Sequence, residues 1–369
     1  MQPASIPARG NKKFLIFGFL SVIAFYLLFV QQYFIGLEKA FGRHCPPTGG
    51  AGIGIAAYRR YTGNHAFDYF MCMLVNVFTT ALKPPARAVN VPFILSLPTS
   101  WLVLLIETAS HFPDRPAYAI GVSTAWGMYA QVFGGGVVFP IFFAFAQSAR
   151  SKVRANNLTI QAPSGPISKG IVLGTMFAVI PTTLLMVLSP THTIITMWQP
   201  FPIYLAIIQA SVLPWYQREL AHTSQKSTLL LRSALIITAS IPIIPHFMFL
   251  RTILSSPEPL QTLISSLLPY PFEFQYASVE DLMTLGPDAE AIRFLKWDAL
   301  FIYNAIWLGG AWSWAFSSMQ TLRRAIVTSL LGGALFGPGV FMAYPYLIQL
   351  QKDEDERITQ VGQRKERKN

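Results

Sequence analysis

The sequence predicts an all-α protein, a polytopic bundle of about eight or nine transmembrane helices with no soluble domain. Of its 369 residues, 52% are hydrophobic and 12% are charged, and the mean hydropathy is +0.42. Soluble domains carry roughly 25% charged residues, so this composition excludes an ordinary soluble enzyme. The apolar residues form long runs rather than alternating patterns, and a run of about 20 residues is long enough to cross a bilayer.

The apolar runs predict nine helices, with ends defined to within about 2–4 residues. They are Phe14–Ile35, Ala66–Leu82, Phe93–Phe112, Tyr118–Gln147, Ile171–Leu188, Ile194–Trp215, Leu229–Leu250, Trp297–Met319 and Ala325–Leu350. The first run is too long for the apolar core of a cleaved signal peptide, so we interpret it as an uncleaved anchor. The fourth run contains Gly134-Gly135-Gly136 and Pro140, which favours one tilted, kinked helix over two half-helices.

The domain organisation follows from these runs. We expect one bundle over residues 1–350, with a lumenal loop at about 251–296 and a charged, disordered tail at 351–369. Basic residues cluster at the ends of the runs, and alternating helices place most of them on one side, which should be cytoplasmic. They are Lys12, Lys13, Lys83, Arg87, Arg150, Lys152, Arg154, Arg218, Lys226, Arg323 and Arg324.

This distribution of charge also bears on partners and location. The net charge of +11 is accounted for by membrane topology, so no nucleic-acid partner is predicted. The expected location is the endoplasmic reticulum membrane, with contact to membrane lipid. The sequence does not indicate an oligomeric state. Cys45 and Cys72 are too few for a disulfide framework and lack metal-ligand spacing, and the runs hold no ligand cluster, so neither metal nor cofactor is expected.

Three carboxylic acids fall within the apolar runs and are the candidate catalytic residues: Asp68, Glu107 and Asp298. A charged group in hydrocarbon costs at least about 2.5–3.5 kcal/mol, so such residues usually face the bundle interior and have a function. With alternating helices, all three would lie toward the same, lumenal side and could line one cavity. A buried, neutral carboxylic acid is a potential general acid.

Each acid also has a structural interpretation. Asp68 and Asp298 stand in first helical turns, where a carboxylate suits the helix N-terminus. Glu107 stands near a helix C-terminus, where the dipole disfavours it, so a structural role is harder to argue for this residue.

Neighbouring side chains suggest a substrate-binding surface. His111 lies four residues after Glu107 and shares its helix face, and Asn76 shares a face with Asp68. Phe301 and Trp312 share a face with Asp298, and Trp126 stands close to the glycine triplet. Aromatic faces near a buried acid suit carbocation chemistry, since they stabilise positive charge. A structural interpretation of each is also open, because a lone buried His and individual Trp residues often serve packing or the membrane interface.

The chain resembles the fungal integral-membrane terpene cyclases of meroterpenoid biosynthesis, the longer type of the ascochlorin, ascofuranone and macrophorin pathways. The resemblance covers nearly the whole chain. It rests on Ala66-Phe-Asp-Tyr-Phe, Leu105-Ile-Glu107, Phe112-Pro-Asp-Arg-Pro116 and Lys296-Trp-Asp298-Ala-Leu.

The resemblance implies a metal-independent enzyme that cyclises the farnesyl chain, often terminally epoxidised, of a prenylated phenol or polyketide. It implies acid roles for Glu107 and Asp298, with Asp298 as proton donor and Glu107 as its partner, or the reverse. Asp68 would support them or accept the final proton.

Two other functions are open from the sequence. A proton-coupled transporter of a lipophilic small molecule would use the same carboxylates as relay sites. Such transporters commonly show inverted repeats, and we find no convincing repeat here. A non-catalytic membrane scaffold would leave the intramembrane acids unexplained.

Overall fold

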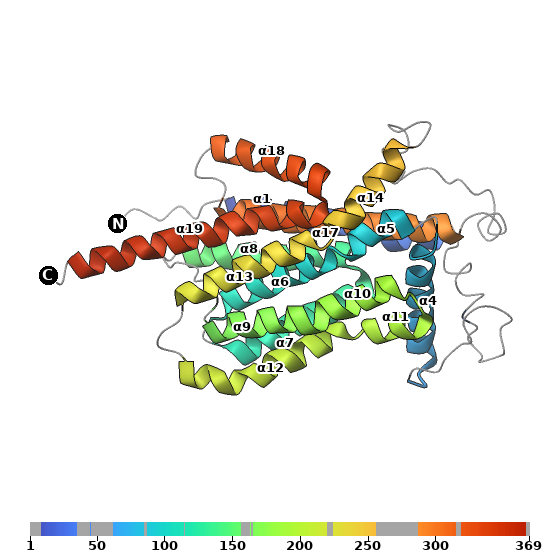
Figure 1. The fold of residues 1–369 in the computed structure, drawn as a ribbon, viewed down its shortest axis with the longest axis horizontal. Coiled ribbons are helices and arrows are strands. Elements are labelled where there is room, and N and C mark those ends of the chain that lie inside the picture. The colour runs from blue at the N-terminus through green and yellow to red at the C-terminus, as the bar shows by residue number, and fades with distance from the viewer. Residues whose placement is uncertain are drawn as a thin grey trace.

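The computed structural model describes residues 9–34, 45, 62–84, 87–113, 115–155, 163, 165–219, 224–255, 287–314 and 319–366. Every regular element within these residues is a helix, which confirms the predicted all-α class. Most of the helices lie side by side along the long axis of the molecule and form one bundle (Figure 1).

The first part of the chain, up to residue 155, forms helices that include the glycine triplet at the junction of the last two. They are α1 (Arg9–Phe25), η1 (Tyr26–Val30), α2 (Gln31–Phe34), α4 (His65–Ala81), α5 (Arg87–Ile94), α6 (Leu97–His111), α7 (Pro116–Phe133) and α8 (Gly135–Ala155). The second half completes the bundle. Its helices are α9 (Gly165–Gly174), η2 (Thr175–Val179), α10 (Ile180–Leu188), α11 (His192–Trp198), α12 (Phe201–Glu219), α13 (Ser224–Ser240), α14 (Ile243–Leu254), α17 (Pro287–Trp314), α18 (Met319–Phe336) and α19 (Pro338–Glu366).

The fourth predicted run is a helical hairpin, so the prediction of one kinked helix is wrong. α7 and α8 meet at Gly134, whose φ of +76° lies in the left-handed region that favours glycine. Trp126 of α7 and Phe142 of α8 stand equally far from Gly134 along the chain, and their ring centroids are 5.7 Å apart. The two helices therefore run antiparallel.

The last predicted run, Ala325–Leu350, is divided in the same way. α18 ends before Gly337, whose φ is +98°, and Pro338 is the first residue of α19. Proline suits the first position of a helix, because its fixed φ is helical and its missing N–H would be unpaired there. α18 and α19 then run back along each other (Figure 1).

The second predicted span has a different place. α4 lies across one end of the bundle instead of along it (Figure 1), where it contacts α11 and α17. The prediction that Ala66–Leu82 crosses the membrane beside the other helices is therefore not supported.

Side-chain contacts define the two ends of the bundle. α1 runs antiparallel to α8, because Ser21 donates to the Val137 carbonyl at 3.0 Å while Phe14 packs against Phe145. The end at which α1 begins and α8 ends is called here the basic end, since Lys12, Lys13 and Arg150 lie in these helix segments. The opposite end is called the α4 end.

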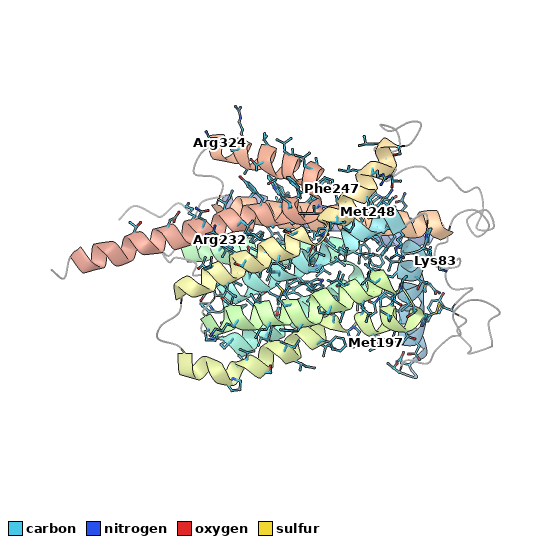
Figure 2. The ribbon with its side chains drawn as sticks, in the orientation of Figure 1. Lys83, Met197, Arg232, Phe247, Met248 and Arg324 are labelled. Carbon is cyan, nitrogen blue, oxygen red and sulfur yellow. A yellow bond between two sulfur atoms is a disulfide. The ribbon has the colours of Figure 1, made fainter. Side chains whose placement is uncertain are left out.

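The basic residues do not all gather as predicted. Figure 2 shows Arg324 toward the basic end and Lys83 toward the α4 end, on opposite sides of the molecule. The expectation that Lys83 and Arg87 join the other basic loops is wrong, because α4 does not run along the bundle.

The surface and length of the helices suit a membrane. Three described segments are long and apolar enough to cross one: Arg87–His111, Gly165–Leu188 and Ser227–Leu254. Large apolar side chains also face outward, and Leu188 and Ile244 are both 73% exposed. A helical bundle is confirmed, whereas the predicted number of spans is not established by these lengths.

The predicted loop and tail differ in how far they are described. Most of the expected lumenal loop, from residue 256 to 286, lies outside the described residues. Residues 35–44 and 46–61, between α2 and α4, also lie outside them. α19 continues to Glu366 and so includes most of residues 351–369, for which disorder was expected.

Candidate active site

Asp298 lies where the α7–α8 hairpin turns. Its Oδ1 accepts a hydrogen bond from the backbone N–H of Gly136, in the first turn of α8, at 2.6 Å. The first amides of a helix have no partner within the helix, and its N-terminus carries partial positive charge. A side chain of α17 therefore caps α8, which is a structural role for the residue predicted as proton donor.

The glycine triplet makes this contact possible. A Cβ at Gly134 would stand 2.9 Å from Asp298 Oδ1, and one at Gly136 would stand 3.1 Å from the Asp298 Cα. A Cβ at Gly135 would meet the Ile302 side chain at 2.5 Å. The triplet thus lets α17 approach the start of α8 closely, and any larger residue would push the carboxylate away.

Aromatic residues stand beside Asp298 on α17. Trp297 and Phe301 are 8% and 6% exposed, with ring centroids 5.9 Å apart, and they pack against Leu27, Leu28 and Val137. The Trp297 indole Nε1 is buried and has no hydrogen-bond partner among the described residues. Asp298 itself is only half-buried. Phe301 stands three residues after Asp298 on the same helix, as the spacing predicted, and its role in binding substrate stays a prediction.

Two features of this region were not predicted. η1 is a π-helical turn between α1 and α2, and its residues Leu27 and Leu28 pack with Trp297. Single turns of π-helix often occur at functional sites. Tyr303, farther along α17, shares a hydrogen bond of 2.9 Å with the Ser96 hydroxyl of the α5–α6 junction. Ser96 and Tyr303 are ordinary residues of apolar runs in the sequence, and only their contact marks them.

Glu107 belongs to a different environment. It is 0% exposed and forms an ion pair with Arg150, whose Nε donates to Glu107 Oε2 at 3.1 Å. The Tyr346 hydroxyl donates to Glu107 Oε1 at 3.0 Å. Gln349 accepts from Arg150 at 2.8 Å when its amide oxygen faces the guanidinium. This network joins α6, α8 and α19 inside the bundle.

The expectation that the three carboxylates line one cavity is wrong. Asp298 contacts α8 at Gly136, and Glu107 contacts it at Arg150, so about 21 Å of helix axis separates the two contacts. Glu107 lies toward the basic end and Asp298 toward the α4 end. Glu107 therefore does not lie beside Asp298 as the predicted partner.

Asp68 is almost fully buried, at 1% exposure, and organises the start of α4. Its Oδ1 accepts from the Thr62 amide at 2.8 Å and the Thr62 hydroxyl at 2.9 Å, while Oδ2 accepts from the Gly63 amide at 3.0 Å. These contacts hold the segment that leads into the helix. These contacts give Asp68 a structural role, but the residue is buried and holds the segment before the helix, whereas the structural interpretation rested on the helix N-terminus itself.

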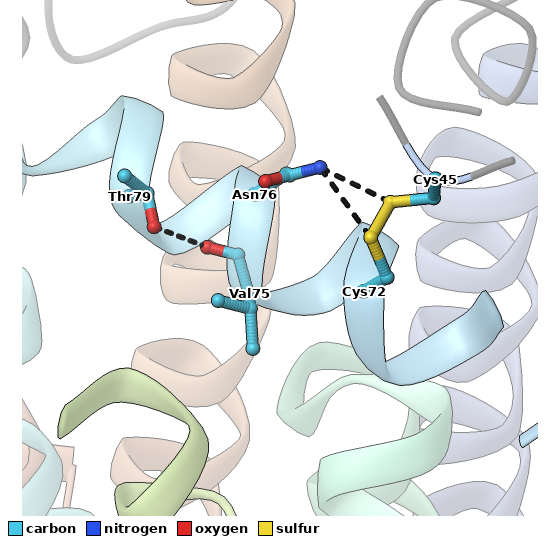
Figure 3. The surroundings of a disulfide bond; sticks show 5 residues. All are labelled: Cys45, Cys72, Val75, Asn76 and Thr79. Carbon is cyan, nitrogen blue, oxygen red and sulfur yellow. Dashed lines mark hydrogen bonds between the residues drawn. A yellow bond between two sulfur atoms is a disulfide. The ribbon is translucent and has the colours of Figure 1, made fainter. Parts of the chain in front are cut away.

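The two cysteines form a disulfide, a pairing that the sequence did not predict. Cys72 lies in α4 and Cys45 in the segment before it, and the Asn76 amide donates toward Cys45 Sγ at 3.1 Å (Figure 3). Disulfides form in oxidising compartments. Asn76, predicted to bind substrate, therefore faces the disulfide at the α4 end.

The remaining predicted binding residues have other contacts. His111 places Nδ1 2.7 Å from the Glu107 carbonyl and Nε2 3.0 Å from the Ala146 carbonyl, which links α6 to α8. Trp126 packs across the α7–α8 hairpin on Phe142 and Phe145. The Trp312 side chain lies outside the described part of the chain. Of the four whose side chains are described, Phe301 alone belongs to the aromatic cluster with Trp297.

Comparison with known proteins agrees with this picture. The model of the CtvD domain matches residues 12–340. A curated relative, terpene cyclase janA of Penicillium janthinellum, is 23% identical over 329 residues, which cover 86% of this chain and 89% of the relative. No solved structure matches. The two matches confirm, at the level of family, the resemblance to fungal terpene cyclases, and the chain belongs to the CtvD-domain family.

Proposed function

We propose that this protein is a membrane-embedded terpene cyclase in which Asp298 starts the cyclisation. The substrate would be a prenylated phenol or polyketide carrying a farnesyl chain with a terminal epoxide. The observation that carries the proposal is the half-buried carboxyl of Asp298, held by the start of α8 and flanked by the buried aromatic residues Trp297 and Phe301. The family match supports the reaction class.

The reaction balances without a cofactor. In its acid form, Asp298 would carry a proton on Oδ2, since Oδ1 accepts from Gly136. Transfer of this proton to the epoxide oxygen breaks a C–O bond, and the π electrons of a nearby alkene form the new C–C bond. Loss of a proton from the final cation returns the enzyme to its starting state, so substrate and product have the same mass. The faces of Trp297 and Phe301 would stabilise the cations between these steps.

Asp298→Asn tests this role sharply. Asparagine retains an oxygen that can accept from Gly136 and is itself a good helix cap, but it cannot supply the proton. We expect microsomes containing this variant to lose about 10²–10⁴-fold in conversion of an epoxyfarnesyl phenol to a product of unchanged mass. Asp355→Asn, an exposed acid of α19, is the matched control and should retain activity. Near-normal conversion by Asp298→Asn would contradict its role as proton donor and leave it only the role of capping α8.

In the same proposal, the other two acids have structural roles. Glu107, paired with Arg150, would position α8, and Asp68 would hold the entry to α4. The transporter alternative gains no specific support from these contacts, because the ion pair and Asp298 stand at opposite ends of α8. Uptake of a lipophilic solute into proteoliposomes driven by a pH gradient would restore that alternative.

We further propose a multi-pass orientation in the endoplasmic reticulum with the basic end in the cytoplasm and the α4 end in the lumen. Lys12, Lys13 and Arg150 at the basic end and the disulfide at the other end support it, whereas Lys83 and Arg87 at the α4 end do not contribute. In sealed microsomes treated with a permeant reductant, a membrane-permeant maleimide should label Cys45 and Cys72, whereas a membrane-impermeant maleimide should not. Labelling of both cysteines by the impermeant reagent in sealed microsomes would contradict the orientation.

A further inference from the structure

A second apolar site lies away from Asp298. A narrow cleft opens between α6, α7, α9 and α12, near the basic end, where α7 and α9 begin. Leu105 and Ala109 of α6 line it. They stand two residues on either side of Glu107, so they point to the opposite face of the helix. The cleft is thus separated from the Glu107–Arg150 ion pair by α6, and it is not the site described above.

The walls of the cleft are shaped by small residues. Ala119 of α7 and Gly170 of α9 line it. One turn along α9, a Cβ at Gly174 would stand 2.5 Å from Leu205 Cδ1. Glycines four residues apart allow two helices to approach closely in a membrane. The close contact of α9 with α12 fixes the part of α12 that carries Gln209.

Gln209 is the feature that points to a ligand. It lines the cleft, is 6% exposed, and its Oε1 has no hydrogen-bond partner among the described residues. A buried carbonyl oxygen without a donor is unfavourable. The other polar side chain of the cleft, Ser123, directs its hydroxyl proton to the Ile120 carbonyl at 3.0 Å. A molecule that enters the cleft therefore meets apolar walls and the side-chain amide of Gln209, whose buried oxygen is the unused acceptor.

We propose that this cleft binds a neutral isoprenoid alcohol or phenol, with its chain along the small residues and its hydroxyl donating to Gln209 Oε1. An acceptor selects a donor, and a charged group would find no partner in these walls. Two molecules share this chemistry: the prenylated phenol of the proposed reaction and a membrane sterol. The inference does not depend on proton transfer by Asp298, since α7 separates Ser123 from the Gly134 turn by about 16 Å.

Photolabelling of the full chain in nanodiscs tests the site. The probe is a farnesyl phenol with a diazirine on the chain, and the readout is labelling of peptides from α9 and α12. Gln209→Leu should reduce labelling about fivefold, as expected for one lost hydrogen bond. Ala119→Phe, which fills the cleft, should abolish it. Ser211→Ala, an exposed polar residue of the same helix, is the matched control.

Further photolabelling experiments identify the ligand and test the hydrogen bond to Gln209 separately. Farnesyl benzene with the same diazirine lacks the hydroxyl and should label no better than Gln209→Leu does with the phenol. Competition by excess farnesyl phenol assigns the site to substrate, and competition by ergosterol alone assigns it to a sterol. Both outcomes support the proposal. Equal labelling by the phenol and the benzene probe, or unchanged labelling of a folded Gln209→Leu protein, would overturn it.

The site and the proposed reaction fail separately. Asp298→Asn should label normally, whether or not it still converts substrate. Loss of labelling in a folded Asp298→Asn protein would show that the cleft is not a separate site, whereas loss of conversion alone concerns only the reaction.

Discussion

The two ends of α8 hold carboxylates in opposite ways. At its start, Asp298 is half-buried and accepts from a backbone amide of the helix. Near its end, Glu107 is fully buried and accepts from the Arg150 guanidinium and the Tyr346 hydroxyl. One carboxylate accepts from a neutral backbone amide, and the other forms an ion pair. The same type of residue, in similar apolar runs, thus has two different environments, and we propose that the first serves chemistry and the second cohesion.

This contrast shows that burial alone does not identify a catalytic acid. Glu107 is the more buried of the two, yet its oxygens are engaged by donors from two other helices. A proton donor needs an oxygen that can hold the proton and face the substrate. Asp298 meets that requirement better because its contact with Gly136 involves only Oδ1.

The largest effect on stability is expected at the ion pair. Glu107→Leu removes the carboxylate that neutralises the buried Arg150 guanidinium, which should cost about 3–5 kcal/mol of unfolding free energy. The measurement is the thermal unfolding midpoint of the protein in detergent. The double variant Glu107→Leu with Arg150→Met should recover most of the loss, since an apolar pair replaces the ionic one. If Glu107→Leu alone were as stable as the parent protein, the ion pair would not stabilise the fold, and the proposed difference between the two ends of α8 would be contradicted.

A smaller effect is expected at the turn of the hairpin. Gly134→Ala places a side chain where φ is +76° and where its Cβ would stand 2.9 Å from Asp298 Oδ1. We expect a loss of about 1–3 kcal/mol in stability and a marked fall in conversion, because the carboxylate must move. Gly121→Ala is the matched control on α7, since nothing stands within 4 Å of its Cβ. Equal behaviour of the two variants would argue against a role of the turn in positioning Asp298.

The smallest effect is expected from the phenol that contacts Glu107. Tyr346→Phe removes one hydrogen bond and should lower stability by about 0.5–1.5 kcal/mol. Conversion of substrate by the folded protein should stay the same, because Tyr346 stands at the basic end. If Tyr346→Phe instead lowered conversion as strongly as Asp298→Asn, the reaction would belong to the Glu107 end, and the assignment of the two regions would be reversed.

The hydropathy of the chain predicted the helices well and their directions poorly. Two errors in the predicted number of passes through the bundle cancel each other. α4 does not run along the bundle, and the fourth run passes along it twice instead of once. Residues after Gly134 therefore keep their predicted side, and Asp298 lies with Asp68 at the α4 end as expected. Glu107, which lies between the two errors, changes sides. The division at Gly337 then returns α19 and its basic residues to the basic end.

A local signal for the reversals was present in the sequence. Gly134 and Gly337 both tolerate left-handed φ, and Gly337 is followed by Pro338, which is a good helix start. Hydropathy averaged over a window does not respond to such a turn, because the residues on both sides remain apolar. A kink and a hairpin therefore look alike until the packing of Trp126 on Phe142 distinguishes them.

The sequence by itself determined the helical class, the apolar surface, the family resemblance and the acids worth testing, because these depend on composition and local pattern. Only the tertiary structure decided which acid meets which partner. Glu107 is separated from Arg150 by 43 residues and from Tyr346 by 239, and Gly136 is separated from Asp298 by 162. Such contacts depend on how helices pack against one another, and local patterns of residues along the chain do not reveal that packing.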